Sequence, residues 1–114
     1  MYDKDNIFAK IIKKKIPCDL IYEDDSVMFF KDINPKAKIH ILGVPKKESI
    51  SLNDFILTSN EKEISNFFQK VIDITKKFNL DKTGYRIVTN HGFDGNQEVP
   101  HFHIHILGGE KLKG

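Results

Sequence analysis

A strictly alternating segment near the end of the chain constrains the fold more than any other feature. The segment reads His101, Phe102, His103, Ile104, His105, Ile106 and Leu107. Successive side chains point to opposite faces of a β-strand. A strand over residues 101–107 therefore places three imidazoles on one face and apolar side chains on the other. We expect the apolar face to belong to the hydrophobic core, whereas the histidine face needs a different explanation.

Two other segments have the periodicity of amphipathic helices. The first helix is expected over Asp5–Lys15, where Asn6 or the aspartate before it can cap the N-terminus. The second and longer helix is expected over Glu61–Phe78, and Asn60 with Glu63 has the spacing of a capping box. We expect the apolar side of the longer helix to face the core.

Four further strands are predicted by short segments rich in β-branched and aromatic residues. These strands are expected over Asp19–Glu23, Val27–Lys31, Lys38–Val44 and Tyr85–Thr89. A turn-rich loop over residues 91–100 joins the last of them to the alternating strand. Strands joined by short turns, with the helices grouped apart from them, predict an α+β fold on a mainly antiparallel sheet, as a single domain over residues 1–114.

The composition excludes several classes of protein. Eighteen basic and sixteen acidic residues give a net charge of +2, which is too small to indicate a nucleic-acid partner. No apolar run is long enough to span a membrane, and the first residues lack the pattern of a secretory signal. The single cysteine, Cys18, excludes an internal disulfide and a four-cysteine zinc site. We expect a cytoplasmic or nuclear protein without a membrane partner.

Three interpretations of the histidine face compete. A solvated strand face usually carries lysine, glutamate or threonine. A zinc ion binds its ligands at about 2.0–2.1 Å, whereas His101 and His105 lie roughly 13 Å apart along a strand. The other soft candidates for zinc, His40, His91 and Cys18, have no ligand-like spacing. Catalysis is the third and favoured interpretation, because a neutral imidazole is both a nucleophile and a proton carrier.

The loop before the histidines favours an anionic substrate. Gly92 and Gly95 leave backbone N–H groups accessible to a phosphate, and Asn90 at the start of the loop adds an amide donor. A glycine-containing loop is weak evidence by itself. Beside three aligned histidines, it predicts a phosphate site.

The alternating segment resembles the motif of the histidine triad superfamily, and the rest of the chain resembles its histidine triad nucleotide-binding branch. The segments that carry this resemblance are Asp5–Ile12, Ile16–Pro17, Glu23–Asp25, Phe30–Ile33, Pro35–Ala37, His40, Val44–Lys46, Gly84–Arg86, Asn90 and Leu107–Gly109. They follow one another in unbroken order along nearly the whole chain. The resemblance implies a homodimer, in which each subunit has a five-stranded antiparallel sheet and two helices, and the sheets join across the interface.

The same resemblance implies an activity. Members of this branch hydrolyse purine nucleoside phosphoramidates, such as AMP linked through nitrogen to lysine or to a simple amine, with no cofactor or metal. His103 resembles the nucleophile, which forms a nucleotidyl-histidine intermediate. His105 and His40 resemble the histidines beside the phosphate, and His101 resembles the triad member that supports the strand and orients His103. Hydrolysis of dinucleoside polyphosphates and a nucleotide-binding interaction module with incidental hydrolysis are the alternatives.

The resemblance also assigns the substrate contacts. The phosphate cradle is matched by Asn90, Asn96, Gln97, Glu98 and Val99. The slot for the base is matched by Ile7, Phe8, Ile11, Phe30 and Ile33. Asp32 matches the carboxylate that accepts both ribose hydroxyls, although an aspartate here is also an ordinary turn residue. His40 is open to a similar structural interpretation.

Two residues depart from the pattern of the branch. Asn96 stands where a glycine is usual, and asparagine tolerates the left-handed backbone that such a position needs. Glu98 replaces the serine of some relatives and brings a negative charge close to the expected phosphate. Substrate preference is therefore the property that these two residues are most expected to alter.

Overall fold

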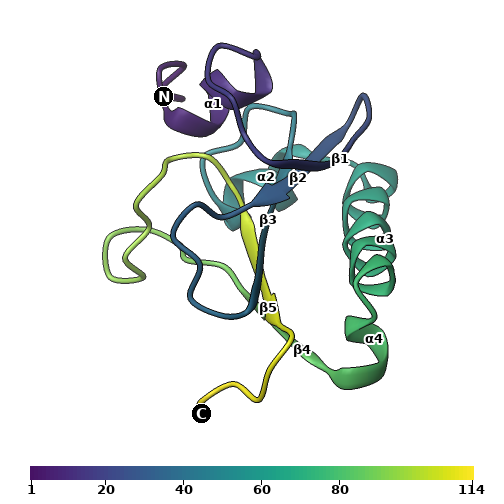
Figure 1. The fold of residues 1–114 in the computed structure, drawn as a ribbon. Coiled ribbons are helices and arrows are strands. Elements are labelled where there is room, and N and C mark those ends of the chain that lie inside the picture. Colours follow the sequence, from purple (N-terminus) through teal and green to yellow (C-terminus); the bar gives the residue numbers. More distant parts are fainter.

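A five-stranded antiparallel sheet forms the centre of the computed structural model, which describes all of residues 1–114 (Figure 1). In chain order the strands are β1 (Leu20–Glu23), β2 (Val27–Lys31), β3 (Ile39–Pro45), β4 (Tyr85–Val88) and β5 (Ile104–Gly108). Their order across the sheet is β1-β2-β3-β5-β4, and every neighbouring pair is antiparallel. The predicted α+β class and antiparallel sheet are confirmed.

Four helices accompany the sheet. They are α1 (Ile7–Ile12), α2 (Leu52–Thr58), α3 (Glu61–Lys77) and α4 (Leu80–Thr83). The first and third are the two predicted helices, with Asn6 as the cap of α1 and the predicted capping box at the start of α3. The short helices α2 and α4 were not predicted. None of the four combines the length and the apolar character needed to cross a lipid bilayer.

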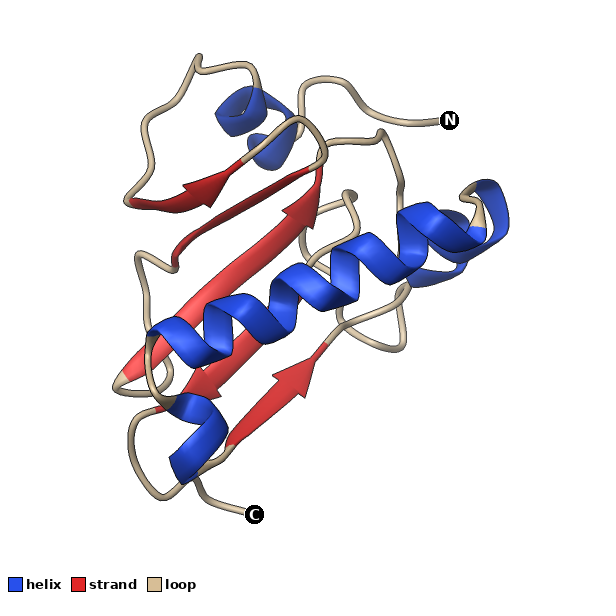
Figure 2. Ribbon diagram, turned by 90° about the vertical axis from the view of Figure 1, so that its right-hand side faces the viewer, coloured by secondary structure: helices blue, strands red, loops and turns tan.

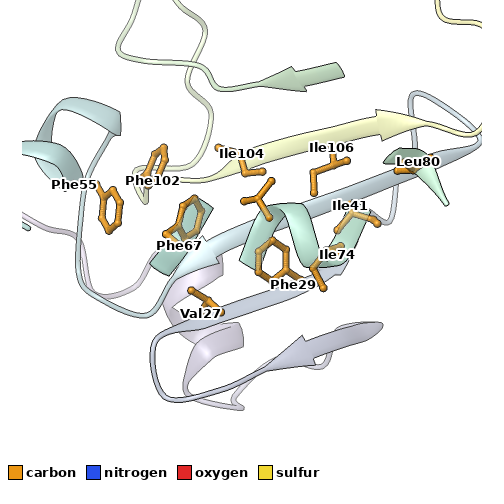
Figure 3. Packing of buried hydrophobic residues seen from close by; sticks show 11 residues of the cluster. Val27, Phe29, Ile41, Phe55, Phe67, Ile74, Leu80, Phe102, Ile104 and Ile106 are labelled. Carbon is orange, nitrogen blue, oxygen red and sulfur yellow. The ribbon is translucent and has the colours of Figure 1, made fainter. Parts of the chain in front are cut away.

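The helix α3 covers one face of the sheet, and α1 lies beside the opposite face (Figure 2). The core between the sheet and α3 contains Val27, Phe29, Ile41, Phe55, Phe67, Val71, Ile74, Leu80, Phe102, Ile104 and Ile106 (Figure 3). Phe67 of α3 lies among three aromatic rings from outside its own helix, with centroid distances of 6.3 Å to Phe29 and 5.4 Å to both Phe55 and Phe102. The even-numbered positions of the alternating segment therefore belong to the core, as predicted.

A smaller apolar cluster fills part of the other face. It contains Phe8, Ile11, Met28, Phe30, Leu42 and Val44. Because α1 has only six residues, it covers only part of this face. The same face carries His40 of β3, His103 just before β5 and His105 within β5.

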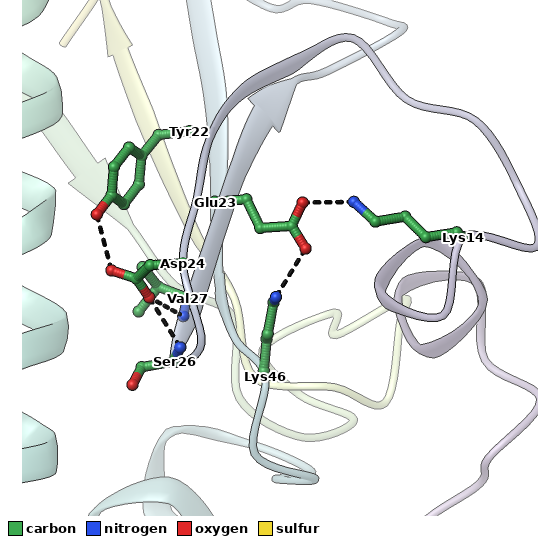
Figure 4. Close-up of polar contacts among 7 residues, drawn as sticks. All are labelled: Lys14, Tyr22, Glu23, Asp24, Ser26, Val27 and Lys46. Carbon is green, nitrogen blue, oxygen red and sulfur yellow. Dashed lines mark hydrogen bonds and ion pairs between the residues drawn. The ribbon is translucent and has the colours of Figure 1, made fainter.

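Polar contacts fix the turn between β1 and β2 and fasten it to the end of α1 (Figure 4). The Asp24 carboxylate accepts hydrogen bonds from the backbone N–H groups of Ser26 and Val27. Beside it, the Glu23 carboxylate lies between the ammonium groups of Lys14 and Lys46, which together lower the pKa of Glu23. An ion pair thus links the segment after α1 to the end of β1.

The regular strand at the end of the chain begins three residues later than predicted. The prediction placed the strand over residues 101–107, but β5 starts at Ile104. The N–H of His101 donates to the Val99 carbonyl, and the N–H of Phe102 donates to the Ser49 carbonyl, so neither joins the sheet ladder. In this part of the chain the side chains still alternate, because Phe102 belongs to the core whereas His103 lines the cavity on the other face.

Candidate active site

A cavity of about 600 Å³ opens on the sheet face that α1 covers in part. Its size is within the range of small-molecule sites. The predicted site residues that line it are Ile7, Phe8, Ile11, Phe30, Asp32, Ile33, His40, Asn90, Asn96, Glu98, Val99, His103 and His105. The predicted residues His101 and Gln97 are not among its lining. The cavity combines an apolar end beneath α1 with a polar end at the histidines.

His103 presents a free nitrogen to this cavity. Its Nδ1 lies 2.7 Å from the backbone carbonyl oxygen of His101, and a carbonyl only accepts, so Nδ1 carries the proton. The lone pair of Nε2 therefore stays available. Burial lowers the pKa of His103, which keeps the ring neutral near pH 7. The ring of Phe8 lies edge-on at a centroid distance of 4.8 Å. A neutral imidazole with this tautomer is a competent nucleophile.

His40 and His105 form a hydrogen-bonded pair beside it. The backbone N–H of Lys36 donates to Nδ1 of His40, so the His40 proton is on Nε2. This Nε2 lies 2.9 Å from Nδ1 of His105 and 3.4 Å from an Asp32 oxygen. His105 Nδ1 accepts, which leaves the proton of His105 on its Nε2. Burial lowers the pKa of His40, and it lowers that of His105 to about 4. Both rings are therefore neutral hydrogen-bond donors.

One group of side chains has its candidate ligand atoms close enough together to hold a metal ion. Its members are Asp32, His40 and His105. Their candidate ligand atoms all lie within 4.8 Å of one another. However, Nδ1 of His40 already accepts the Lys36 N–H, and its Nε2 carries a proton. A histidine must offer a lone pair to bind a metal. The three groups as arranged therefore form a hydrogen-bonded set, and this tautomer does not fit a metal ligand.

Asp32 makes a turn contact and also lies at the cavity. One carboxylate oxygen accepts a hydrogen bond from the Asn34 N–H at 2.8 Å, as in an ordinary turn. The other oxygen faces His40 at the edge of the cavity. His40 also has a structural contact, because its Nδ1 accepts from the backbone of Lys36. A structural contact and a position in the site are thus compatible for each residue.

The loop over residues 91–100 uses several of its predicted phosphate donors internally. The N–H of Gly92 donates to the Gln97 side chain, and the N–H of Asn96 donates to the Phe93 carbonyl. Asn90 donates through its amide to the Gly95 carbonyl. These groups shape the loop, and Asn96 has the expected left-handed backbone, with a φ of 57°.

Two backbone donors remain unpaired among the loop residues that line the cavity. The N–H groups of Glu98 and Val99 have no acceptor within the protein. Gln97 anchors this part of the loop, because its amide donates to the carbonyls of Ile50 and Val99. Of the predicted cradle residues, Glu98 and Val99 therefore combine a place in the cavity lining with an unpaired backbone N–H.

His101 has a buried position outside the cavity. Its exposed fraction is 0 %, and that of His103 is 6 %, so a solvated histidine face is ruled out. Nε2 of His101 lies 2.8 Å from the Pro45 carbonyl oxygen, and Nδ1 lies 2.6 Å from the Tyr2 hydroxyl. Burial lowers the pKa of His101 to about 4. Its side chain supports the strand, and its carbonyl accepts the proton of His103.

Several residues of the site have no signal in the sequence. Cys18, Leu42, Val88 and Leu107 line the cavity. Tyr2 contacts His101 from 99 residues away. Contacts over such separations depend on the fold, and no local spacing indicates them. By contrast, His91, which had no assigned role, lies exposed in the loop.

Three alternating histidines, of which His103 and His105 line an apolar cavity, form the arrangement of a histidine triad protein. A family model described as HIT domain matches residues 13–112 of the chain. The protein therefore belongs to the HIT domain family. A histidine triad protein from Clostridium difficile has a similar structure, with a TM-score of 0.87 and 44% sequence identity. That similarity covers 100% of this chain and 98% of the other.

Curated relatives are similar over almost their full length. A HIT-like protein of Rickettsia prowazekii is 50% identical over 114 residues, which cover 100% of this chain and 95% of the relative. A purine nucleoside phosphoramidase of Escherichia coli strain K12 is 37% identical over 109 residues, which cover 96% of this chain and 91% of the enzyme. This activity is that of the Escherichia coli protein.

Proposed function

We propose that the protein is a purine nucleoside phosphoramidase, which cleaves the P–N bond of AMP–amine or AMP–lysine substrates. The observation that carries this proposal is the tautomer of His103, whose Nδ1–H is held by a carbonyl while its Nε2 faces a nucleotide-sized cavity. The similarity to the Escherichia coli phosphoramidase supports the same reaction class.

In the proposed reaction, Nε2 of His103 attacks the α-phosphorus of the substrate. A P–N bond to His103 forms while the P–N bond to the amine breaks, and water later hydrolyses the nucleotidyl-histidine to AMP. The departing nitrogen must gain a proton, because an amide anion is a poor leaving group. The neutral His105 ring assists as a hydrogen-bond donor, because its Nε2–H has no acceptor within the protein and lies in the same cavity. The proton that the amine gains comes from solvent water.

The proposed orientation of the nucleotide follows from the two ends of the cavity. Asp32 at the edge offers an acceptor for the ribose hydroxyls. Beneath α1, the apolar end fits a purine, and its residues are Ile7, Phe8, Ile11, Phe30 and Ile33. The third group of contacts is to the phosphate, whose oxygens accept hydrogen bonds from the N–H groups of Glu98 and Val99.

The charge of Glu98 favours an amine over a phosphate as the leaving group. Glu98 lines the cavity with His103 and takes part in none of the ion pairs of the structure. An unpaired carboxylate attracts a cationic amine substituent and repels an anionic polyphosphate. Phosphoramidates are therefore better substrates in this proposal than dinucleoside polyphosphates.

The direct test is turnover of a fluorogenic adenosine phosphoramidate by the wild type and by His103→Ala. We expect the variant to lose at least about a thousandfold in kcat/KM, because no other nucleophile replaces the imidazole. A phosphohistidine hydrolyses in acid. The turnover reaction is therefore quenched at alkaline pH before mass spectrometry of the adduct. A His103→Ala variant with most of its activity, or a wild type that never forms the adduct, would refute the mechanism.

The same assay separates the alternative functions. Faster cleavage of diadenosine polyphosphates than of AMP–amine substrates would identify a polyphosphate hydrolase. Tight binding of AMP without turnover of any phosphoramidate would identify a nucleotide-binding module. Each result excludes the phosphoramidase as the main function.

We further propose a homodimer that joins two sheets through β4. This strand lies at an edge of the sheet, and its Tyr85 and Ile87 side chains are 38 % and 39 % exposed. An unpaired edge with apolar side chains is a ready surface for strand pairing. Sedimentation of the wild type is expected to give a dimer, and Ile87→Lys is expected to shift it toward the monomer. A monomeric wild type at micromolar concentration would contradict this interface.

A further inference from the structure

The hydroxyl of Tyr2 reaches a buried imidazole from the opposite end of the chain. Its oxygen lies 2.6 Å from Nδ1 of His101, and the two rings meet edge to face with centroids 5.6 Å apart. On the other side of the His101 ring, Nε2 donates to the Pro45 carbonyl at 2.8 Å. Because Nε2 carries the proton, Nδ1 is an acceptor, and the Tyr2 O–H donates to it.

Burial makes this contact important for the orientation of the His101 ring. The exposed fraction of His101 is 0 %, so water does not replace a lost donor at Nδ1 without rearrangement of its surroundings. An unpaired buried acceptor costs about 1–3 kcal/mol. The ring is thus held between two fixed partners, one on β3 and one in the N-terminal segment.

His101 in turn holds the nucleophile of the proposed reaction. Its backbone carbonyl accepts the Nδ1–H of His103 at 2.7 Å. The backbone of His101 lies outside the sheet ladder, because β5 begins only at Ile104. The side-chain contacts of His101 are therefore anchors for the carbonyl that sets the tautomer of His103.

We propose that Tyr2 is a positioning residue for the nucleophile. Its hydroxyl fixes the ring of His101, and through the His101 carbonyl it fixes the orientation and the tautomer of His103. This inference rests on the proposed function, in which His103 attacks phosphorus. Tyr2 does not line the cavity, so its effect reaches the reaction through His101 and not through contact with substrate.

The kinetic test compares two variants that each lose one hydroxyl. Tyr2→Phe removes the donor to His101, whereas Tyr22→Phe removes the donor to Asp24, in the turn between β1 and β2. We expect Tyr2→Phe to lower the single-turnover rate of P–N cleavage about tenfold, because a small displacement of a reacting group is costly. The Kd for AMP is expected to stay within twofold, and Tyr22→Phe to keep the wild-type rate.

Ring-nitrogen NMR provides the second readout. Long-range proton–nitrogen spectra near pH 7 are expected to show the wild-type His101 proton on Nε2 and the His103 proton on Nδ1. In Tyr2→Phe we expect the His101 proton to stay on Nε2, which still donates to the Pro45 carbonyl, whereas the Nδ1 signal of His101 shifts because it loses its donor and the His103 signals shift with it. These spectra need no substrate, so they decide whether Tyr2 fixes the rings even if the wild type has no phosphoramidase activity, which would refute the proposed function alone.

Several outcomes would overturn the role of Tyr2. One is an unchanged cleavage rate together with unchanged His103 signals in Tyr2→Phe. Another is an equal loss of activity in Tyr22→Phe, which would indicate a general effect of a lost hydroxyl. If Tyr2→Phe does not fold, the wild-type spectrum still decides, because a His101 proton on Nδ1 excludes the hydrogen bond from Tyr2 as described.

Discussion

Strands β2, β3 and β5 present side chains to both faces of the sheet, and the two faces differ in what covers them. On one face, α3 closes a core of eleven buried residues, all of them apolar. On the other, the shorter α1 contributes to an apolar cluster of six, and the cavity beside that cluster is lined by His40, His103 and His105.

The difference shows how one sheet combines a stable scaffold with a reactive site. The face beneath α3 has no titratable side chain in its cluster, so its stability comes from apolar burial. The opposite face buries neutral histidines, whose hydrogen bonds hold them in one tautomer each. We therefore expect changes on the first face to alter stability, and changes on the second to alter pH dependence and substrate binding.

The largest effect is expected from Phe67→Ala, on the face beneath α3. Phe67 is 1 % exposed and lies among three aromatic rings, so its removal leaves a cavity that the neighbours fill only in part. The free energy of unfolding is expected to fall by about 3–5 kcal/mol. Urea unfolding measures this change, and the fraction that stays folded is expected to keep its KM.

A phenylalanine of the loop provides the matched control. Phe93 is 98 % exposed, and Phe93→Ala is expected to change the free energy of unfolding by less than about 0.5 kcal/mol. Similar losses in the two variants would show that burial beneath α3 does not dominate stability. A large change in KM for folded Phe67→Ala would show that the two faces are not independent.

Acid sensitivity is expected to arise from the histidine face. The usual histidine pKa of 6.5 applies to the unfolded chain, whereas His101 in the folded protein has a pKa of about 4. Between these values the unfolded state binds more protons, so stability is complete above about pH 6.5 and falls as the pH decreases to about 4. For His101 alone the loss is about 3 kcal/mol.

Urea unfolding at a series of pH values measures this loss. His101→Gln lacks the titrating ring, so we expect a lower stability at pH 7 but a weaker dependence on pH between 6.5 and 4. An unfolding free energy of the wild type that stays constant over this interval would contradict the assignment of neutral, buried histidines.

The sequence was sufficient for features that depend on local periodicity. The alternation over residues 101–107 predicted which side chains enter the core, and the Asn60 capping box predicted the start of α3. It did not predict α2, whose seven residues give too few turns for a clear period. Nor did alternation distinguish the ladder of β5 from the extended residues before it, because both conformations have the same side-chain period.

The site was predictable only in part, because local periodicity does not indicate contacts between residues far apart in the chain. The resemblance indicated most of the cavity lining, but the tautomers depend on contacts between distant residues. The backbone N–H of Lys36 sets the tautomer of His40. The hydroxyl of Tyr2 donates a hydrogen bond to His101, which lies 99 residues further along the chain. A backbone donor has no residue-type signal, and a tyrosine near the N-terminus has no local pattern.

A smaller effect, confined to substrate binding, is expected from Asp32→Asn. Asparagine keeps an oxygen that can accept the Asn34 N–H, so the turn is preserved, but it loses the charge that the ribose hydroxyls would meet. We expect KM for an adenosine phosphoramidate to rise about tenfold, since hydrogen bonds to a charged group are the stronger ones. Steady-state kinetics measure the change.

The control for this variant is Asp25→Asn, which neutralises an exposed carboxylate in the turn between β1 and β2, outside the cavity. We expect wild-type KM values for Asp25→Asn. A comparable rise in both variants would indicate a long-range effect of net charge, and an unchanged KM in Asp32→Asn would remove the carboxylate from the proposed ribose contact.

The smallest effects are expected from removing the N-terminal caps of α1 and α3. These changes compare the two faces of the sheet directly, because each alters the helix that covers one face in the same way. Asn6 caps α1 by accepting from the Ala9 N–H, and Asn60 caps α3 by accepting from the Glu63 N–H. Replacement of either by alanine is expected to cost about 1 kcal/mol of stability.

Only Asn6→Ala is expected to raise KM, about twofold to threefold, because α1 forms the apolar end of the cavity whereas α3 lies behind the sheet. Unfolding and kinetics of both variants measure this. An equal rise in KM for the two would mean that the sheet transmits changes in its core to the site, and the separation of the two faces would then be wrong.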